Sequence, residues 1–174
     1  MILKSEDEIQ FLMETLKSVE SVSGDLAEAG VYEGGSADII TNLSRGSPVH
    51  LFDTFEGFIE GQILNGENYK AGDLKGNYQR IKYHFDHYSN VNIYIGDVIK
   101  TKEKVIDRNF KFVHLDLDIY KPTIVCLEFF WQRISAGGII LVDDYCPTNW
   151  GIIKAVNEFI SKYNIELKRG PSRL

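Results

Sequence analysis

The chain has 174 residues, of which 44% are hydrophobic and 25% are charged, and its formal net charge is −6. These values fit one soluble globular domain and are untypical of a disordered or fibrous chain. The acidic balance, without a run rich in Lys and Arg, argues against duplex nucleic acid as the main partner.

The N-terminal residues 1–8 contain no apolar run of signal-peptide length. No stretch of the sequence reaches the roughly eighteen apolar residues that a membrane span needs. We therefore expect a cytoplasmic protein that forms a single domain over residues 1–174. The cysteines Cys126 and Cys146 lack the spacing of a metal motif and do not indicate a disulfide framework.

The first predicted element is an amphipathic helix over residues 6–21. Ser5 and Glu8 have the spacing of a capping box, and apolar residues follow at helical intervals. Gly24 ends this segment. Residues 26–32 then predict a short strand that leads through a glycine-rich turn into a second helix.

The glycine-rich turn contains Gly30, Gly34 and Gly35. A strand, a glycine turn and a helix in this order are typical of a nucleotide-binding α/β unit. Glycine admits a ligand where a Cβ would collide, and the helix N-terminus beyond it attracts negative charge. The spacing differs from the Gly-x-Gly-x-x-Gly of dinucleotide-binding proteins, so a plain tight turn is the alternative.

The next predicted strand, residues 49–53, ends in Asp53. A carboxylate at this place in doubly wound folds accepts hydrogen bonds from two vicinal ribose hydroxyls. Residues 54–72 then carry several glycines and aromatic residues without periodicity. So long a connection favours a lid over the site, with simple disorder as the alternative.

A helix over residues 73–87 and a third strand over residues 91–95 follow. His84 and His87 lie three residues apart on this helix, but no further soft metal ligand is near in sequence. We therefore treat a shared metal ion there as a minor alternative. Asp97 follows the strand and is interpreted as a contact to a purine amino group or as a turn former.

Two further apolar strands, residues 111–117 and 139–142, end in acidic side chains. Adjacent strands lie about 4.8 Å apart, so acids at their tips repel unless a cation lies between them. A hard divalent ion such as Mg²⁺ is the simplest candidate, and solvated turn formers are the alternative. The expected ligands are Asp116, Asp143 and Asp144, with Asp118 a weaker candidate one pleat further on.

The remaining pattern predicts a helix that begins near Pro122 and ends at Gly137 and Gly138, a last helix capped near Asn149, and a sixth strand over residues 165–167. Strands that alternate with helices predict an α/β fold, a doubly wound and mostly parallel sheet with helices on both faces. In such a sheet the ligand lies at the carboxyl ends of the strands.

Four segments of the sequence resemble the macrocin O-methyltransferase family: residues 28–36 (EAGVYEGGS), 52–57 (FDTFEG), 114–120 (HLDLDIY) and 142–145 (VDDY). They lie in the family's order, and their combination is specific where each alone is not. The resemblance implies a Rossmann-like class I methyltransferase fold. It also implies S-adenosylmethionine and Mg²⁺ as cofactors, and a hydroxyl group of a sugar or glycosylated natural product as the methyl acceptor.

The resemblance also implies roles for individual residues. Glu28 and the glycine turn would hold the methionine end of the cofactor, Asp53 its ribose, and Asp97 would lie near its adenine. The metal ligands, which would also be the catalytic residues, would be the three acids named above. The cofactor-binding residues that it implies are Glu28, Gly30, Tyr32, Gly34, Gly35, Ser36, Asp53, Phe55 and Asp97.

An ion held by the three acids would orient a substrate hydroxyl and lower its pKa. The sequence does not identify a general base, and His114 is expected to face inward as a structural residue. The seventh, antiparallel strand that is usual for this fold has no counterpart in the sequence. The chain is also shorter than typical family members, so the resemblance leaves two alternatives: a truncated chain, or a lineage that lacks part of the substrate pocket, and activity is left open.

Two other functions fit part of the pattern. An NAD-type oxidoreductase would explain the glycine turn and Asp53, but it gives the acids no role and requires a different glycine spacing. A non-catalytic module that binds S-adenosylmethionine, or an assembly subunit, would need no acid cluster. The expected partner is a small-molecule hydroxyl acceptor, whose identity the sequence does not contain, and homo-oligomerisation is left open.

Overall fold

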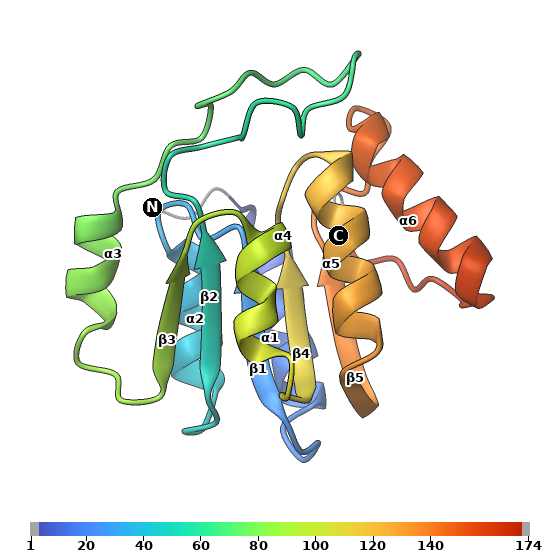
Figure 1. Cartoon of the computed structure of the whole chain (residues 1–174). Coiled ribbons are helices and arrows are strands. Elements are labelled where there is room, and N and C mark those ends of the chain that lie inside the picture. The colour runs from blue at the N-terminus through green and yellow to red at the C-terminus, as the bar shows by residue number, and fades with distance from the viewer. Residues whose placement is uncertain (1–3, 172–174) are drawn as a thin grey trace.

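The computed structural model describes residues 4–171. Within this part of the chain, five strands form one sheet and helices cover both of its faces (Figure 1). Residues 1–3 and 172–174 belong to the predicted domain of residues 1–174 but lie outside the described residues. Residues 1–3 are also part of the N-terminal segment 1–8, in which no signal peptide was predicted.

The elements alternate between helix and strand along most of the chain. In order they are α1 (Glu6–Ser18), β1 (Asp25–Ala29), α2 (Gly35–Leu43), β2 (Val49–Asp53), α3 (Tyr78–Phe85), β3 (Val91–Ile95), α4 (Val98–Thr101), the 3₁₀ helix η1 (Lys102–Val105), β4 (Phe110–Leu115), α5 (Tyr120–Trp131), β5 (Ile134–Val142) and α6 (Trp150–Tyr163).

The sheet has the strand order β3-β2-β1-β4-β5, and all four strand pairs are parallel. The chain winds outward from β1 to β3 and then crosses back to β4, so the winding direction reverses between β1 and β4. Ligands in open α/β sheets bind at such a reversal, at the carboxyl ends of the strands. The predicted doubly wound sheet is therefore confirmed.

Two hydrophobic cores hold the helices to the sheet. On one face, α1 and α2 pack against the strands through residues such as Leu12 and Ile40. On the other face, α4, α5 and α6 pack through residues such as Val98, Phe130 and Val156. Burial on both faces explains why the central strands are almost continuously apolar instead of alternating.

The capping box predicted at the start of α1 is present, because the Ser5 side chain accepts from the Glu8 backbone N–H and the Glu8 carboxylate accepts from the Ser5 backbone N–H. The helix is shorter than predicted and ends at Ser18. The predicted helix over 73–87 begins only at Tyr78, and the chain between β2 and this helix is irregular.

The prediction that α5 extends to Gly137 and Gly138 was wrong. The helix ends at Trp131, and β5 begins as early as Ile134. The two glycines lie inside β5, where the pairing of β5 with β4 shifts in register and Gly137 adopts a φ of 82°. Glycine in a strand is typical of a bulge of this kind, which the sequence pattern did not distinguish from a helix end.

The predicted sixth strand over residues 165–167 was also wrong, because these residues are irregular. Asn164 ends α6 in the left-handed conformation, and the Ile165 N–H donates to the Ile160 carbonyl. This is the hydrogen bond of a Schellman motif, in which the residue after the left-handed position packs its side chain back on the helix. Ile165 packs against the second core, which accounts for its apolar character.

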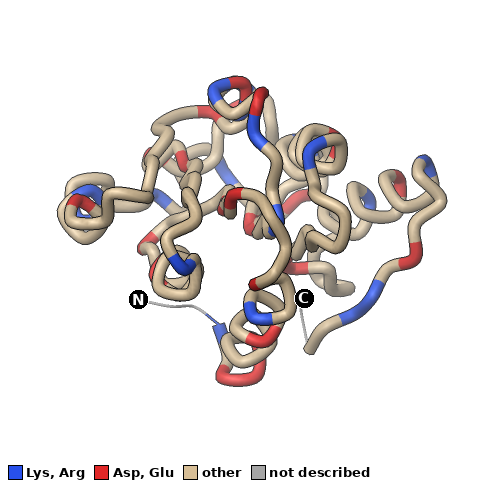
Figure 2. Tube along the Cα trace, turned by 90° about the horizontal axis from the view of Figure 1, so that it is seen from below, with Lys and Arg blue, Asp and Glu red and all other residues tan. Residues whose placement is uncertain are grey.

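Within residues 4–171, no helix combines the length and apolar character needed to cross a membrane. Viewed along the strands, the basic and acidic residues of the described chain are interspersed (Figure 2).

Candidate active site

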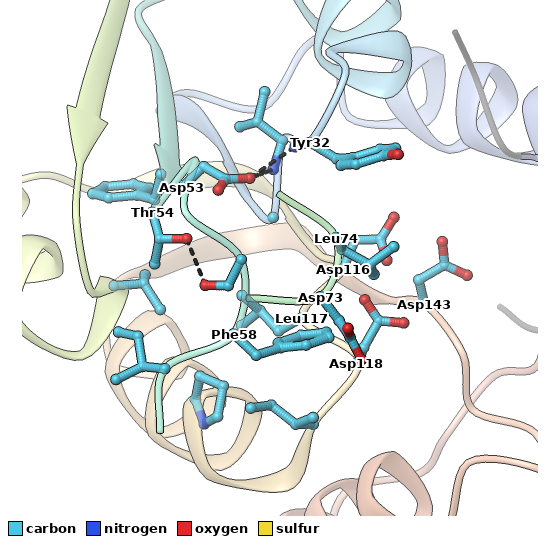
Figure 3. A pocket seen from close by; sticks show the side chains of 18 of the residues that line it. Tyr32, Asp53, Thr54, Phe58, Asp73, Leu74, Asp116, Leu117, Asp118 and Asp143 are labelled. Carbon is cyan, nitrogen blue, oxygen red and sulfur yellow. Dashed lines mark hydrogen bonds between the residues drawn. The ribbon is translucent and has the colours of Figure 1, made fainter. Parts of the chain in front are cut away.

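A pocket lies at the carboxyl ends of the strands. Its wall includes Gly30 after β1, Asp53 at the end of β2, Asp116 after β4, Asp143 after β5 and Phe58 from the irregular segment that follows β2. In Figure 3, Asp53 and Tyr32 lie on one side of this pocket, and the carboxylates that follow β4 and β5 gather on the other. The strand tips therefore converge on one site, as the sequence predicted.

The backbone of the glycine turn is in direct contact with the backbone that follows β4. Gly30 has a φ of +93°, and a Cβ added to it would lie 1.7 Å from the carbonyl oxygen of Asp116. The glycine is thus required by the neighbouring backbone, in addition to any ligand. Gly34, with a φ of +81°, begins α2 and faces Ile81 on α3.

Asp53 holds the turn that follows β1. One of its carboxylate oxygens accepts from the N–H groups of Val31 and Tyr32, both at 2.7 Å, and the other accepts from the Phe55 N–H at 2.6 Å. A carboxylate offers about four lone-pair positions, so one position is left for a ligand. Asp53 can therefore accept one ribose hydroxyl, whereas the sequence argument assumed two.

The structure separates the nine predicted cofactor-binding residues into two groups. Three of them do not line the pocket: Glu28 is completely buried beside His114, Gly34 faces α3, and Phe55 packs against Tyr78. The residues that do line the pocket are Gly30, Tyr32, Gly35, Ser36, Asp53 and Asp97.

The acids that follow β4 and β5 belong to two sharp turns. Asp118 and Asp144 both adopt left-handed φ values, 58° and 59°, which few residues other than glycine tolerate and which Asp tolerates better than most. Asp116 and Asp143 continue the strand register, since their N–H groups donate to the carbonyls of Ala29 and Leu115. Non-glycine residues in this conformation are often found at functional sites.

Two sets of possible metal ligands meet at Asp116. Its carboxylate lies within 4.8 Å of ligand atoms of Asp118 and Asp144, and also within 4.8 Å of those of His114 and Asp143. Asp116, Asp143 and Asp144 were predicted to bind one ion, with Asp118 a weaker candidate. The structure brings all four acids to one rim but assigns Asp143 and Asp144 to different sets.

A lysine that the sequence argument did not consider lies at the same rim. The Lys4 ammonium is 3.0 Å from an Asp116 carboxylate oxygen and also contacts the Asp143 carboxylate, and its side chain is only 6% exposed. The described acids of this rim are Asp116, Asp118, Asp143 and Asp144, and Lys4 contacts two of them. Burial, followed by the neighbouring Asp144 and Asp116 carboxyls, raises the pKa of Asp118 to about 8. Among residues 4–171, acidic groups at the rim therefore outnumber the ammonium group, and their repulsion favours a proton on Asp118.

The irregular segment of residues 54–77 crosses above the strand tips (Figure 1). The Tyr69 hydroxyl donates to the Asp118 carboxylate at 2.9 Å. The Glu67 carboxylate accepts from the Tyr120 N–H at 2.7 Å, at the start of α5, and the Trp150 indole N–H donates to the Gly66 carbonyl at 2.7 Å. The segment is thus fastened over the acid rim, and its motion as a lid stays a prediction.

His84 and His87 were a minor candidate for a metal site. His84 pairs with Asp38 at 2.9 Å, and neither histidine belongs to the two ligand sets found among residues 4–171.

Solved structures share this architecture. A calicheamicin methyltransferase aligns with a TM-score of 0.80 at 20% sequence identity, covering 95% of this chain and 75% of that one. The O-methyltransferase NovP aligns with a TM-score of 0.78 at 23% identity, covering 93% and 74%. The fold is therefore that of the Rossmann-like class I methyltransferases.

Sequence comparison identifies the family within this class. Residues 4–168 match the family described as macrocin-O-methyltransferase (TylF). The chain is 27% identical over 179 residues to the 8-demethyl-8-(2,3-dimethoxy-alpha-L-rhamnosyl)-tetracenomycin-C 4′-O-methyltransferase of Streptomyces olivaceus. It is 27% identical over 167 residues to the demethyldecarbamoylnovobiocin O-methyltransferase of Streptomyces niveus.

The chain belongs to the macrocin O-methyltransferase family, and it is an S-adenosylmethionine-dependent O-methyltransferase by this membership. The two alignments cover 94% and 83% of the chain. The chain spans 67% and 61% of the length of these relatives.

Proposed function

We propose that this chain transfers a methyl group from S-adenosylmethionine to a hydroxyl group of a sugar or glycosylated natural product, with Mg²⁺ bound at the acid rim. The observation that carries the proposal is one pocket with the glycine turn at one side and clustered carboxylates at the other. The names of the two Streptomyces relatives, which describe O-methylation of natural products, support the acceptor class.

The donor atoms at the rim fit a divalent ion. Carboxylate oxygens are the ligands that Mg²⁺ prefers, and the rim retains negative charge beyond what Lys4 neutralises. Asp116, which belongs to both ligand sets, would hold the ion together with Asp143 and Asp144, one from each set. When bound, it would supply Lewis acidity that orients the acceptor hydroxyl and lowers the pKa of that hydroxyl.

The cofactor would lie along the opposite side of the pocket. The turn from Gly30 to Ser36, whose shape Asp53 fixes through two backbone hydrogen bonds, would hold the methionine portion. Asp53 would accept from one ribose hydroxyl through its remaining lone pair, and Asp97 would lie toward the adenine. A rigid turn reduces the entropy lost on binding and fixes the direction of the methyl group.

Asp118 is the candidate general base that the sequence argument did not find. It lines the pocket beside Asp116, and burial together with neighbouring carboxyls raises its pKa to about 8. A base with a pKa near the working pH accepts a proton most effectively. Tyr69 donates a hydrogen bond to Asp118 and would fix the orientation of its carboxylate.

Calorimetric titration tests the proposal against its rivals. S-adenosylmethionine and NAD are each added to the protein with and without Mg²⁺, and we expect binding of the former only. Preference for NAD would support an oxidoreductase and contradict the proposal. Binding of S-adenosylmethionine without magnesium-dependent turnover on any hydroxyl acceptor would indicate a non-catalytic module.

We also propose a cytoplasmic location, which cell fractionation would test.

A further inference from the structure

Two buried titratable residues have no part in the function proposed above. Glu28 on β1 and His114 on β4 are register partners in the sheet, and both are 0% exposed. The His114 Nδ1 lies 2.7 Å from a Glu28 carboxylate oxygen. Burial of a carboxylate and an imidazole is costly unless both are fully paired, so this pair needs an explanation.

The pairing of His114 is incomplete. Among residues 4–171, no group forms a hydrogen bond with its Nε2 or with the second Glu28 oxygen. The buried His50 on β2 provides a contrast, because its Nδ1 contacts the Tyr94 hydroxyl at 3.0 Å and its Nε2 contacts Asp25 at 2.9 Å. An unpaired buried nitrogen is unfavourable, which indicates that His114 Nε2 has a partner in the functional protein.

The orientation of this nitrogen suggests what the partner is. Residues two apart in a strand lie on the same face, so His114 on β4 and Asp116, which continues the register of β4, share one face. The His114 Nε2 lies 4.0 Å from an Asp143 carboxylate oxygen, and donor atoms of His114, Asp116 and Asp143 lie within 4.8 Å of one another. Two donor atoms that bind one ion at about 2.1 Å each can be at most about 4.2 Å apart. The 4.0 Å between His114 Nε2 and the Asp143 oxygen is within this limit, so one ion could contact both atoms.

The position between the Asp116 and Asp143 carboxylates is occupied by a positively charged group. The Lys4 ammonium contacts both Asp116 and Asp143 there. An ion at this position would displace Lys4 and would meet two carboxylates and one imidazole nitrogen.

We propose that His114 Nε2 is a direct ligand of the divalent ion, beside Asp116 and Asp143, and that Glu28 is the positioning residue that holds its ring. Glu28 would accept from Nδ1–H and leave the Nε2 lone pair directed at the ion, an arrangement that usually accompanies metal-binding histidine. The inference rests on the proposed function for the presence of an ion. It adds a nitrogen ligand to the carboxylates, and Mn²⁺ is a suitable probe because it accepts the same carboxylate ligands as Mg²⁺.

Pulsed electron paramagnetic resonance of the intact chain with Mn²⁺ tests the proposal without any substrate. Histidine is supplied with an isotopic nitrogen label, so a coordinated imidazole gives a hyperfine coupling that changes with the label. We expect this coupling in the wild type, its loss in His114→Gln, and its retention in His50→Gln. His50 is a matched control, because it is also buried and paired with a carboxylate.

Calorimetric titration with Mn²⁺ tests the role of Glu28. Loss of a carboxylate that orients a metal-binding histidine commonly weakens the metal affinity about 10–100-fold, and we expect this from Glu28→Gln. Asp25→Asn, which removes the carboxylate beside His50, should leave the affinity unchanged. An unchanged affinity in Glu28→Gln would contradict its positioning role.

Bound Mn²⁺ without a nitrogen coupling in the wild type would overturn the proposal and leave an ion held by carboxylates alone. A coupling that persists in His114→Gln would overturn it too. Absence of any bound Mn²⁺ would overturn both this proposal and the ion of the proposed function. Circular dichroism would show whether His114→Gln folds. If it does not fold, the presence or absence of the nitrogen coupling in the labelled wild type still tests whether an imidazole binds the ion.

Discussion

The backbones of Gly30 and Asp116 touch, so that a Cβ on the glycine would lie 1.7 Å from the aspartate carbonyl oxygen. This contact joins the tip of β1 to the tip of β4, at the position where the winding of the sheet reverses. The glycine turn and the acid rim are therefore parts of one rigid unit. Methyl transfer needs the donor and the acceptor at a fixed separation, and this contact would help to set it.

Gly30→Ala should destabilise the protein and weaken cofactor binding. The matched control is Gly46→Ala, because Gly46 has a φ of +80° with no atom within 4 Å of an added Cβ. The left-handed φ alone should lower the free energy of unfolding by about 1–2 kcal/mol in the control. Denaturant titration should show a larger loss in Gly30→Ala, and equal losses would contradict the steric argument.

Lys4→Met should increase the affinity for divalent ions. The Lys4 ammonium contacts the same carboxylates as the proposed ion, so the ion must displace it. We expect a gain of about tenfold, equivalent to about 1.4 kcal/mol, in calorimetric titration with Mn²⁺. Lys17→Met on the exposed side of α1 is the control and should have no effect. An unchanged or lower affinity in Lys4→Met would show that the lysine is not a competitor.

Stability should fall with rising pH through Asp118. Its pKa is raised from 3.8 to about 8 in the folded protein, so between these values the folded state binds more protons than the unfolded state. The free energy of unfolding therefore decreases as the pH rises from 4 to 8. Asp118→Asn should remove this contribution, and the exposed Asp107→Asn should not. A metal-free pH series of denaturant titrations with identical slopes for wild type and Asp118→Asn would be inconsistent with the raised pKa.

Glu67→Ala should release the segment of residues 54–77. The Glu67 carboxylate accepts from the N–H groups of Leu64 and Tyr120, and α5 has no side-chain cap from its own N-cap residue. Loss of a helix cap lowers the free energy of unfolding by about 0.5–2 kcal/mol. Limited proteolysis should cut this segment faster than in the wild type, whereas Glu60→Ala, at an exposed position in the same segment, should behave as wild type. Equal cleavage rates for both variants would contradict the role of Glu67.

The parts of the fold that the sequence predicted correctly depend on local patterns. Apolar strands that stop at acids predicted the convergence of Asp53, Asp116 and Asp143 on one pocket, because parallel strands place their carboxyl ends at one edge. The errors arose where one pattern has two physical causes. Glycines in β5 form a bulge instead of ending a helix, and Ile165 completes the cap of α6 instead of a strand.

Two features of the site were not predicted from the sequence. Lys4 is one lysine near the start of the chain, and only the packing of α1 beside the sheet brings it to the acids. The Glu28–His114 pair depends on the register of β1 and β4, which the sequence does not specify. The strict alternation of side chains along β4 would have placed His114 on the same face as Asp116, and this was the available clue.

The central claim is that an ion bound by these acids activates the acceptor hydroxyl beside the cofactor. Its most direct test is transfer of a radiolabelled methyl group from S-adenosylmethionine to sugars with vicinal hydroxyls, with Mg²⁺ or with excess chelator, for wild type and Asp143→Asn. We expect transfer by the wild type with Mg²⁺ only, no transfer by Asp143→Asn, and cofactor affinity within a few-fold of wild type in the variant. Transfer that persists in chelator, or equal loss of cofactor affinity and transfer in Asp143→Asn, would contradict the account.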